Sequence, residues 1–259
     1  MASLDDFASA RSVADLLGKC GPIALFLDFD GVIAEIAPTP DTVHVPGTTI
    51  SRLQSLNSAL YGALAVVSGR KIDALDTLLA PLSLAVAGDH GNARRRSDGQ
   101  VIMQNEPAAR AAFALAGALR ERFAGDSRII VEAKPSAVAV HYRLAPERAD
   151  ECLEAVRASI EATPELTMIE GKMVVEARAL GVDKGTAVRG FMSEAPFIGR
   201  TPIFVGDDVT DEDGFVAAQE AGGVGIKVGT GDTVALFRIG STADVPTLLD
   251  TIIKRDGWN

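Results

Sequence analysis

The stretch Ile23–Ile33, which reads IALFLDFDGVI, constrains the fold more than any other part of the chain. It is apolar up to Leu27 and again at Phe29, a pattern that is typical of a strand buried on both faces of a parallel sheet. Asp28 and Asp30 then stand at the carboxyl end of the strand, where open α/β sheets bind ligands. They emerge on the same side, and the repulsion between two carboxylates favours a bound cation, for which hard oxygen donors indicate Mg²⁺. Taken alone, the motif also fits a turn in which Asp accepts main-chain N–H bonds.

Charge and cysteine content limit the possible partners. The net charge of the 259-residue chain is −10, which argues against nucleic acid because that binding needs a basic face. An anionic small molecule remains possible, since a bound metal and a few Lys or Arg side chains set the local field. Cys20 and Cys152 make neither a metal motif nor a disulfide framework. The chain shows no signal-peptide pattern and no apolar run of membrane-spanning length, so we expect a cytoplasmic protein without membrane partners. We also expect a monomer.

Two further segments place polar groups where an anion could bind. The apolar run 63–67 ends in Ser68-Gly69-Arg70, whose hydroxyl, exposed main-chain N–H and following helix start make a phosphate-sized anion site. A simple N-cap Ser is the alternative. Lys184 stands near the start of another predicted helix, where the helix dipole disfavours a cation. We therefore expect Lys184 to have an anionic partner.

The acidic run Gly206–Asp213 follows a predicted strand over residues 202–205 and contains five acidic residues within seven positions. So much negative charge after a buried strand needs an offset, which a divalent cation provides, although an acidic helix start is the alternative. The segment Gly223–Gly229 lacks the G-x-G-x-x-G spacing and the acidic residue that would follow it. We interpret residues 225–228 as a strand rather than as part of a dinucleotide loop.

The pattern changes after about residue 107, from alternating strands and helices to helices separated by antiparallel strand pairs. We predict a helix over residues 108–123, strands over 128–132 and 137–143, a helix over 146–162, and a strand pair within 167–177 that turns at Glu170-Gly171. This αββαββ unit, residues 108–179, is interpreted as an α+β cap domain inserted into a core of residues 1–107 and 180–259. An amphipathic helix over residues 3–19 should pack on the core sheet.

The strands of the predicted cap alternate between apolar and polar side chains. Val138, Val140 and Tyr142 share one face, whereas the opposite face carries His141, Arg143, Lys172, Glu176 and Arg178. The polar face either meets water, as antiparallel sheets often do, or forms a lid that binds hydroxyl and phosphate groups. The pattern does not decide between these two possibilities.

Four polar clusters stand at the ends of elements of the predicted core: Asp28 with Asp30, Ser68, Lys184, and Asp207 with Asp208 and Asp211. A parallel sheet brings the carboxyl ends of its strands together at one edge. We therefore predict an α/β fold with a doubly wound, Rossmann-like parallel sheet. Its edge would combine a metal, a nucleophilic carboxylate, an acid/base carboxylate and two phosphate ligands.

These motifs resemble those of the haloacid dehalogenase superfamily of phosphatases, and within it the trehalose-6-phosphate phosphatases, over about residues 23–245. Val32 stands where the family usually has Thr, and Gly214 where it usually has Ala; neither change removes a catalytic group. The segments that carry the resemblance are Asp28-Phe29-Asp30-Gly31-Val32, Ser68-Gly69-Arg70, Gly88-Asp89-His90-Gly91, Lys134, His141-Tyr142-Arg143, Gly171-Lys172 with Glu176 and Arg178, Lys184-Gly185, and the run from Gly206 to Asp213.

The resemblance implies Mg²⁺-dependent hydrolysis of trehalose 6-phosphate to trehalose and phosphate through an aspartyl-phosphate, the last step of trehalose biosynthesis. It implies that Asp28 is the nucleophile and Asp30 the general acid and base, with Ser68 and Lys184 binding the phosphoryl oxygens. Asp28, the Asp30 carbonyl and Asp207 would hold Mg²⁺, and Asp208 and Asp211 would hold metal-bound waters or Lys184. The cap would close over the site and exclude water. Substrate contacts are implied for Ser68, Gly69, Arg70, His90, Lys134, His141, Arg143, Lys172, Glu176 and Arg178.

Three alternatives stay open on the sequence. A phosphatase of the same superfamily that acts on sucrose phosphate or a mannosyl phosphate shares the core motifs and differs in the cap. A phosphorylated signalling receiver also combines an Asp cluster, Ser or Thr, and Lys on a parallel sheet. It lacks the second Asp two residues after the nucleophile, and it lacks an inserted lid. A catalytically inactive binding module is disfavoured by the presence of Asp28, Asp30, Lys184 and Asp207.

Overall fold

A computed structural model describes residue 13 and residues 21–37, 42–103, 105–134, 136–171 and 173–254. The chain divides into two compact units: unit 1 comprises Met1–Ile102 and Asp183–Asn259, and unit 2 comprises Met103–Val182. Apart from Val13, the helix expected over residues 3–19 lies outside the described residues, as does Lys172. Among the described residues, no helix is long and apolar enough to cross a membrane.

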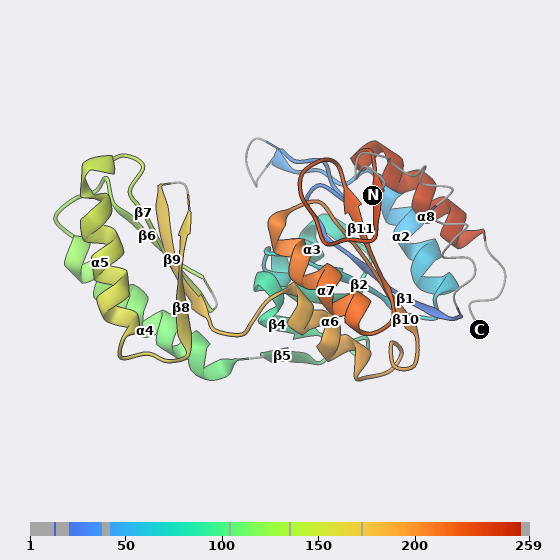
Figure 1. Cartoon of the computed structure of the whole chain (residues 1–259), viewed down its shortest axis with the longest axis horizontal. Coiled ribbons are helices and arrows are strands. Elements are labelled where there is room, and N and C mark those ends of the chain that lie inside the picture. Colours follow the sequence, from blue (N-terminus) through green and yellow to red (C-terminus); the bar gives the residue numbers. More distant parts are fainter. Residues whose placement is uncertain are drawn as a thin grey trace. The chain divides into compact units, whose positions relative to one another are not determined.

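Unit 1 is built on one eight-stranded sheet with the spatial order β12-β11-β10-β1-β2-β3-β4-β5 (Figure 1). Its first six strands in that order pair in parallel, and β4 pairs with β3 in the antiparallel sense. Strands β2 to β5 extend the sheet on one side of β1 and strands β10 to β12 on the other, which places a topological switch point beside β1. The strands are β1 (Ile23–Leu27), β2 (Leu64–Val67), β3 (Ala85–Gly88), β4 (Ala93–Arg95), β5 (Val101–Met103), β10 (Thr201–Gly206), β11 (Val224–Val228) and β12 (Phe237–Ile239).

The central strands are buried because helices cover both faces of the sheet. Every residue of β1 and β2 is buried, as continuous apolar runs predict for parallel strands. In Figure 1, α2 and α8 lie together on one side of the strands, and α6 and α7 lie together on the other. The helices are α2 (Gly47–Ala59), α3 (Ile72–Leu79), α6 (Lys184–Met192), α7 (Glu212–Glu220) and α8 (Val245–Ile253), with single turns of 3₁₀ helix at Asp89–Gly91, Val209–Asp211 and Thr242–Asp244. The predicted α/β class with a doubly wound parallel core is confirmed.

Unit 2 is a four-stranded antiparallel sheet with two helices on one face (Figure 1). The Asn105 side chain caps the first helix by accepting a hydrogen bond from Ala108 N at 3.0 Å. Val138, Val140 and Val175 point into the apolar core beneath the helices. The elements are α4 (Glu106–Phe123), β6 (Ile130–Ala133), β7 (Ala137–His141), the 3₁₀ turn Pro146–Arg148, α5 (Ala149–Ile160), β8 (Leu166–Gly171) and β9 (Val174–Ala179), and the strand order is β6-β7-β9-β8.

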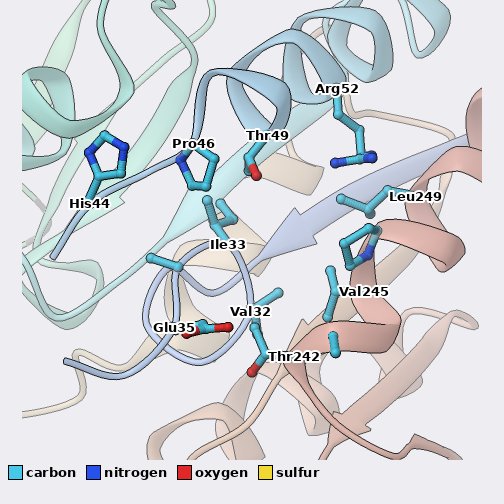
Figure 2. Close-up of a pocket in the computed structure, with 13 residues that line it drawn as sticks. Val32, Ile33, Glu35, His44, Pro46, Thr49, Arg52, Thr242, Val245 and Leu249 are labelled. Atoms are coloured by element: carbon cyan, nitrogen blue, oxygen red, sulfur yellow. The ribbon is translucent and has the colours of Figure 1, made fainter.

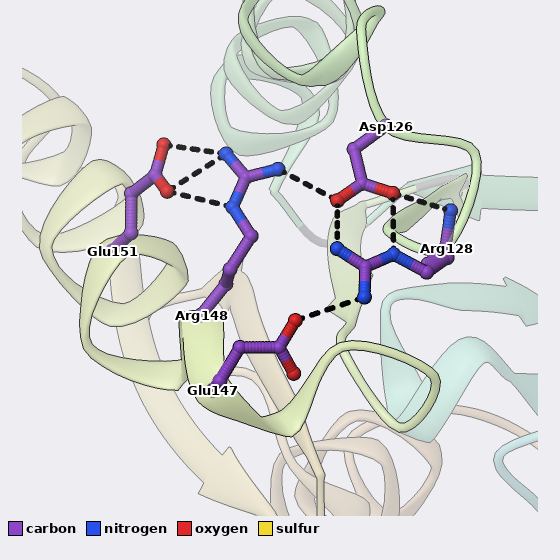
Figure 3. A network of polar contacts seen from close by, with 5 residues as sticks. All are labelled: Asp126, Arg128, Glu147, Arg148 and Glu151. Atoms are coloured by element: carbon purple, nitrogen blue, oxygen red, sulfur yellow. Dashed lines mark hydrogen bonds and ion pairs between the residues drawn. The ribbon is translucent and has the colours of Figure 1, made fainter.

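Hydrogen bonds and ion pairs among five charged side chains connect the loops of unit 2 at the ends of its helices (Figure 3). Asp126, just beyond α4, accepts hydrogen bonds from Arg128 at 2.7 Å and from Arg148 at 3.0 Å. Arg128 also donates to Glu147 at 2.8 Å, and Arg148 donates to Glu151 at the same distance. The two arginines hold the pKa of Asp126 well below its usual range, chiefly through the hydrogen bonds from Arg128. The network belongs to the helix and loop layer of unit 2.

The position of one turn differs from the sequence prediction. The turn expected at Glu170-Gly171 lies further along, because β8 continues through Gly171, which pairs with Val174 of β9. Met173 occupies the left-handed region with φ of 62°, so the chain reverses there rather than at the glycine. Glycine was the stronger turn signal in the sequence, but the ladder of β8 with β9 determines the register.

Candidate active site

The ends of β1, β2 and β10 converge on one cavity of about 530 Å³ in unit 1. Asp28 directly follows β1 and Asp207 directly follows β10, and Asp28 N donates to Val205 O at 2.9 Å. Ser68 follows β2, and Lys184 opens α6. The residues lining the cavity are Asp28, Asp30, Ile36, Ser68, Gly69, Arg70, His90, Lys184, Asp207, Asp208 and Thr210. The structure thus brings together the core residues that the sequence singled out.

The floor of the cavity is a buried cation between two buried carboxylates. Lys184 Nζ lies 2.9 Å from Asp28 Oδ1 and 2.6 Å from Asp211 Oδ1, and all three side chains are almost inaccessible to solvent. The other oxygen of Asp211 accepts hydrogen bonds from the main-chain N–H groups of Asp207 and Asp208, each at 2.9 Å. Asp211 therefore orients both Lys184 and the loop that follows β10.

The electrostatics of this floor leave negative charge uncompensated. Burial raises the pKa of Asp28 from 3.8 to about 8; Lys184 opposes the rise and Asp211 adds to it. Burial lowers the pKa of Lys184, but the two carboxylates more than offset this effect, so its pKa lies above the usual value. Burial, with the charges of Asp211 and Asp208, raises the pKa of Asp207 to about 6. Both raised carboxyl pKa values mean that further positive charge in the cavity would be stabilising.

The donor set fits a hard divalent cation. One carboxylate oxygen from each of Asp28, Asp207 and Asp211 lies within 4.8 Å of the other two. Gly31, directly after Asp30, has φ of +77°, and a Cβ at this position would overlap the Asp207 carboxylate. Only glycine therefore allows the two loops to approach this closely.

Asp30 faces the same cavity in a different environment. Its two carboxylate oxygens accept hydrogen bonds from Arg70 Nε at 2.8 Å and Nη2 at 2.7 Å, in the bidentate geometry that fixes a carboxylate plane. The Arg70 guanidinium also lies 5.4 Å from the centre of the buried Phe29 ring. The Asp30 side chain is 39% exposed, whereas Asp28 is buried. The two carboxylates of the motif thus differ in burial and in partner: Asp28 contacts Lys184, and Asp30 contacts Arg70.

The loop after β3 packs against the loop after β2. Ser68 is buried, and its Oγ accepts a hydrogen bond from Arg70 N at 3.2 Å. His90 N donates to Ser68 O at 3.0 Å, and the His90 ring covers Gly69 so closely that a Cβ there would overlap it. Asp89 and His90 both lie in the left-handed region, with φ of 52° and 54°. Two adjacent non-glycine residues with positive φ indicate backbone strain that the surrounding contacts maintain.

Asp208 is more exposed than Asp207 and Asp211. It is exposed, and its Oδ1 accepts a hydrogen bond from Val209 N at 2.6 Å, as the N-cap of the 3₁₀ turn Val209–Asp211. Asp208 nevertheless borders the cavity, and its charge contributes to the raised pKa of Asp207.

In unit 2, the predicted substrate residues lie on or next to the sheet face that the helices leave uncovered. Lys134 Nζ donates to Glu176 Oε2 at 2.9 Å, and His141 Nε2 lies 3.0 Å from Glu132 Oε2. Arg178 follows Glu176 by two residues on β9 and therefore points to the same face. Arg143, exposed, comes just after β7.

Sequence reasoning missed several residues of these surroundings. Glu132 belongs to the uncovered face of unit 2, and the alternation Ile130, Glu132, Lys134 was the signal that could have indicated it. Lys227 is buried in β11, where a charged residue within an apolar run was a second available signal. Thr242 donates to Gly31 O at 2.7 Å from 211 residues away, and no local pattern indicates such a contact.

Comparisons with known proteins agree with this geometry. The model of the trehalose-phosphatase family matches residues 26–237. The trehalose-6-phosphate phosphatase of Escherichia coli (strain K12) is 42% identical over 229 residues, which cover 88% of this chain and 86% of the E. coli protein. The solved structure of a trehalose-6-phosphate phosphatase related protein superposes with a TM-score of 0.70 at 25% identity, over 88% of this chain and 96% of that one. A phosphatase of the HAD superfamily from Bacteroides thetaiotaomicron, at 15% identity, shares the fold with a TM-score of 0.61 over 98% of this chain and all of its own.

Proposed function

Because the chain belongs to the trehalose-phosphatase family, within the haloacid dehalogenase superfamily, we propose that it hydrolyses trehalose 6-phosphate to trehalose and inorganic phosphate. The observation that carries the proposal is the single cavity in which Asp28, Asp30, Ser68, Lys184 and Asp207 meet. Carboxylates, a hydroxyl and a buried ammonium are the groups that phosphoryl transfer requires for attack, for proton transfer and for charge stabilisation. The reaction is the last step of trehalose biosynthesis.

We assign the chemical steps to the two carboxylates of the first motif. Asp28 attacks phosphorus in line; its bond to phosphorus forms while the bond to the sugar oxygen breaks, giving an aspartyl-phosphate. Asp30 donates a proton to the departing sugar oxygen, and then accepts one from the water that hydrolyses the intermediate. The partial exposure of Asp30 supports this role, because a general acid must reach both the leaving group and water.

Asp28, the Asp30 carbonyl and Asp207 would hold Mg²⁺, which supplies positive charge against the phosphoryl oxygens when it is bound. Lys184 and Ser68 bind the transferring phosphoryl group, assisted by the main chain at Gly69. Asp211 keeps Lys184 in place, as its 2.6 Å contact supports. Asp208 adds negative charge at the cavity margin. Arg70 and His90 border the same cavity, and we assign them to contacts with the substrate.

We assign sugar recognition to the uncovered sheet face of unit 2. Lys134, His141, Arg143, Glu176 and Arg178 offer charged donors and acceptors to sugar hydroxyl groups, and Lys172 is included on sequence grounds. The 42% identity to the E. coli trehalose-6-phosphate phosphatase, over most of both chains, favours trehalose 6-phosphate over the phosphates of sucrose or mannose derivatives.

Replacing Glu176 with Ala is expected to raise KM for trehalose 6-phosphate about 10-fold or more while kcat changes little, because a lost hydrogen bond between a carboxylate and a sugar hydroxyl weakens binding. Steady-state kinetics measure both parameters. Glu147→Ala is the matched control: Glu147 also pairs with a basic side chain, Arg128, but within the helix and loop layer (Figure 3). Equal KM values for Glu176→Ala and the wild type would contradict the recognition role.

The function itself is tested by phosphate release from a panel of sugar phosphates, with Mg²⁺ and with EDTA. Mg²⁺-dependent release that is strongest from trehalose 6-phosphate is the expected result. Equal release from many hexose phosphates would support the phosphatase chemistry but contradict the assignment of trehalose 6-phosphate as the substrate. No release from any substrate would contradict the proposal as a whole.

A further inference from the structure

The loop after β1 and the loop after β10 are in direct contact at Gly31 and Asp207. The absence of a side chain at Gly31 leaves just enough room for the Asp207 carboxylate. A small shift of either loop would therefore change the distance between Asp207 and the Asp30 backbone. Something other than the strands must fix these loops, because both lie beyond the ends of the sheet ladder.

Lys227 holds the loop after β10. It lies on β11, opposite Gly206 in the parallel ladder, and its Nζ donates to the main-chain carbonyl of Asp207. The side chain is 4% exposed, and among the described residues no carboxylate forms an ion pair with it. A buried ammonium with only a carbonyl partner is costly unless nearby negative charge compensates it. The Asp cluster supplies that charge, since Lys227 opposes the rise in the pKa of Asp207.

Thr242 holds the loop after β1. Its Oγ1 donates to Gly31 O at 2.7 Å. Figure 2 shows Thr242 beside Val32, and both residues line a separate cavity of about 330 Å³. Thr242 therefore reaches Gly31 from a part of the chain 211 residues away. In each loop, one side chain from another element thus binds the main-chain carbonyl of the residue at the contact.

We propose that Lys227 and Thr242 are positioning residues, which set the geometry of the metal-binding carboxylates by holding the main-chain carbonyls of Asp207 and Gly31. The inference rests on the proposed function, since it concerns the same site. Groups that orient metal ligands typically change metal affinity or activity about 10- to 100-fold when they are removed. Both residues lie outside the motifs from which the active site was predicted.

The test compares Thr242→Val and Lys227→Met with the wild type by two measurements. Mg²⁺ titration of the melting temperature gives the apparent Kd for Mg²⁺ without any turnover, and kinetics at saturating Mg²⁺ give kcat. We expect each variant to raise this Kd and to lower kcat, each about 10-fold. The matched controls are Thr251→Val, which removes a hydroxyl bond to Thr247 O in α8, and Arg238→Met, which removes hydrogen bonds to Gly229 O and Gly231 O.

The outcomes separate the inference from the function on which it rests. Wild-type protein that neither binds Mg²⁺ nor releases phosphate would contradict the proposed function. An active wild type with variants that lose only melting temperature would show a purely structural role and overturn the inference. Tighter Mg²⁺ binding by Lys227→Met, with normal Thr242→Val, would also overturn it, because Lys227 would then act by charge alone. If Lys227→Met does not fold, Thr242→Val and Lys227→Arg carry the test, and wild-type values for both would overturn the inference.

Discussion

Asp28→Asn should reduce turnover of trehalose 6-phosphate by about 10⁴-fold or more, because an amide cannot form the covalent intermediate that the nucleophile makes possible. The fold should survive, since Asn has almost the same volume and removes a buried carboxyl group that carries an electrostatic cost. Lys184 retains Asp211 as a partner at 2.6 Å. Phosphate release and circular dichroism of the same preparation measure the two properties. Turnover within 10-fold of the wild type would show that Asp28 is not the nucleophile.

The same substitution should change how stability depends on pH. Burial raises the pKa of Asp28 from 3.8 to about 8, so in this interval the folded, metal-free protein binds a proton that the unfolded chain has released. The free energy of unfolding should therefore fall as the pH rises from about 4 to about 8, and Asp28→Asn should make this fall less steep. Urea unfolding in EDTA at several pH values measures the slope. A variant as pH-dependent as the wild type would contradict the assigned shift.

Lys184→Met should abolish activity and also destabilise the protein, by about 3 kcal/mol, because it leaves two buried carboxylates without their cation. The distances of 2.9 Å to Asp28 and 2.6 Å to Asp211 identify the groups that lose their partner. The loss should be larger at pH 8 than at pH 6, since Asp28, whose pKa is raised to about 8, is protonated at the lower pH and then does not need the ammonium. Urea unfolding of metal-free protein measures it.

The double variant Asp28→Asn/Lys184→Met provides the control for this explanation. Removing one of the two carboxylates should recover part of the stability that Lys184→Met loses, because residues in contact do not contribute additively. If the effects of the two substitutions simply added, the destabilisation would come from lost packing of the Lys184 side chain rather than from uncompensated charge.

Local sequence patterns were sufficient to predict the core and the central residues of the candidate site. Asp28, Ser68 and Asp207 each follow an apolar run, and the rule that parallel strands share one carboxyl edge predicted that they meet. Arg70 illustrates the limit of this reasoning. The family resemblance implied a substrate contact for it, and the structure shows that its guanidinium donates two hydrogen bonds to Asp30, 40 residues away. Periodicity predicts which edge a residue reaches and not which neighbour it binds.

The roles of Lys227 and Thr242 could not be predicted from the sequence for a related reason. Both bind main-chain carbonyl groups, and a carbonyl oxygen is present at every residue, so no residue type marks the acceptor. Only the packing of β11 on β10, and of the 3₁₀ turn Thr242–Asp244 against the first loop, selects these partners. The turn at Met173 belongs to the same class, because strand pairing rather than residue preference set its place.

The central position of β1 has a consequence for how the chain is made. One neighbour of β1 is β2, but its other neighbour is β10, and Ile23 pairs with Thr201. During synthesis from the N-terminus, one edge of this fully buried strand stays without its partner until all of unit 2 has been produced. An open apolar edge is a template for aggregation, and pairing between such distant segments folds slowly. The strand that precedes Asp28 is therefore left with an open apolar edge for much of synthesis, and the cavity can assemble only after β10 has emerged.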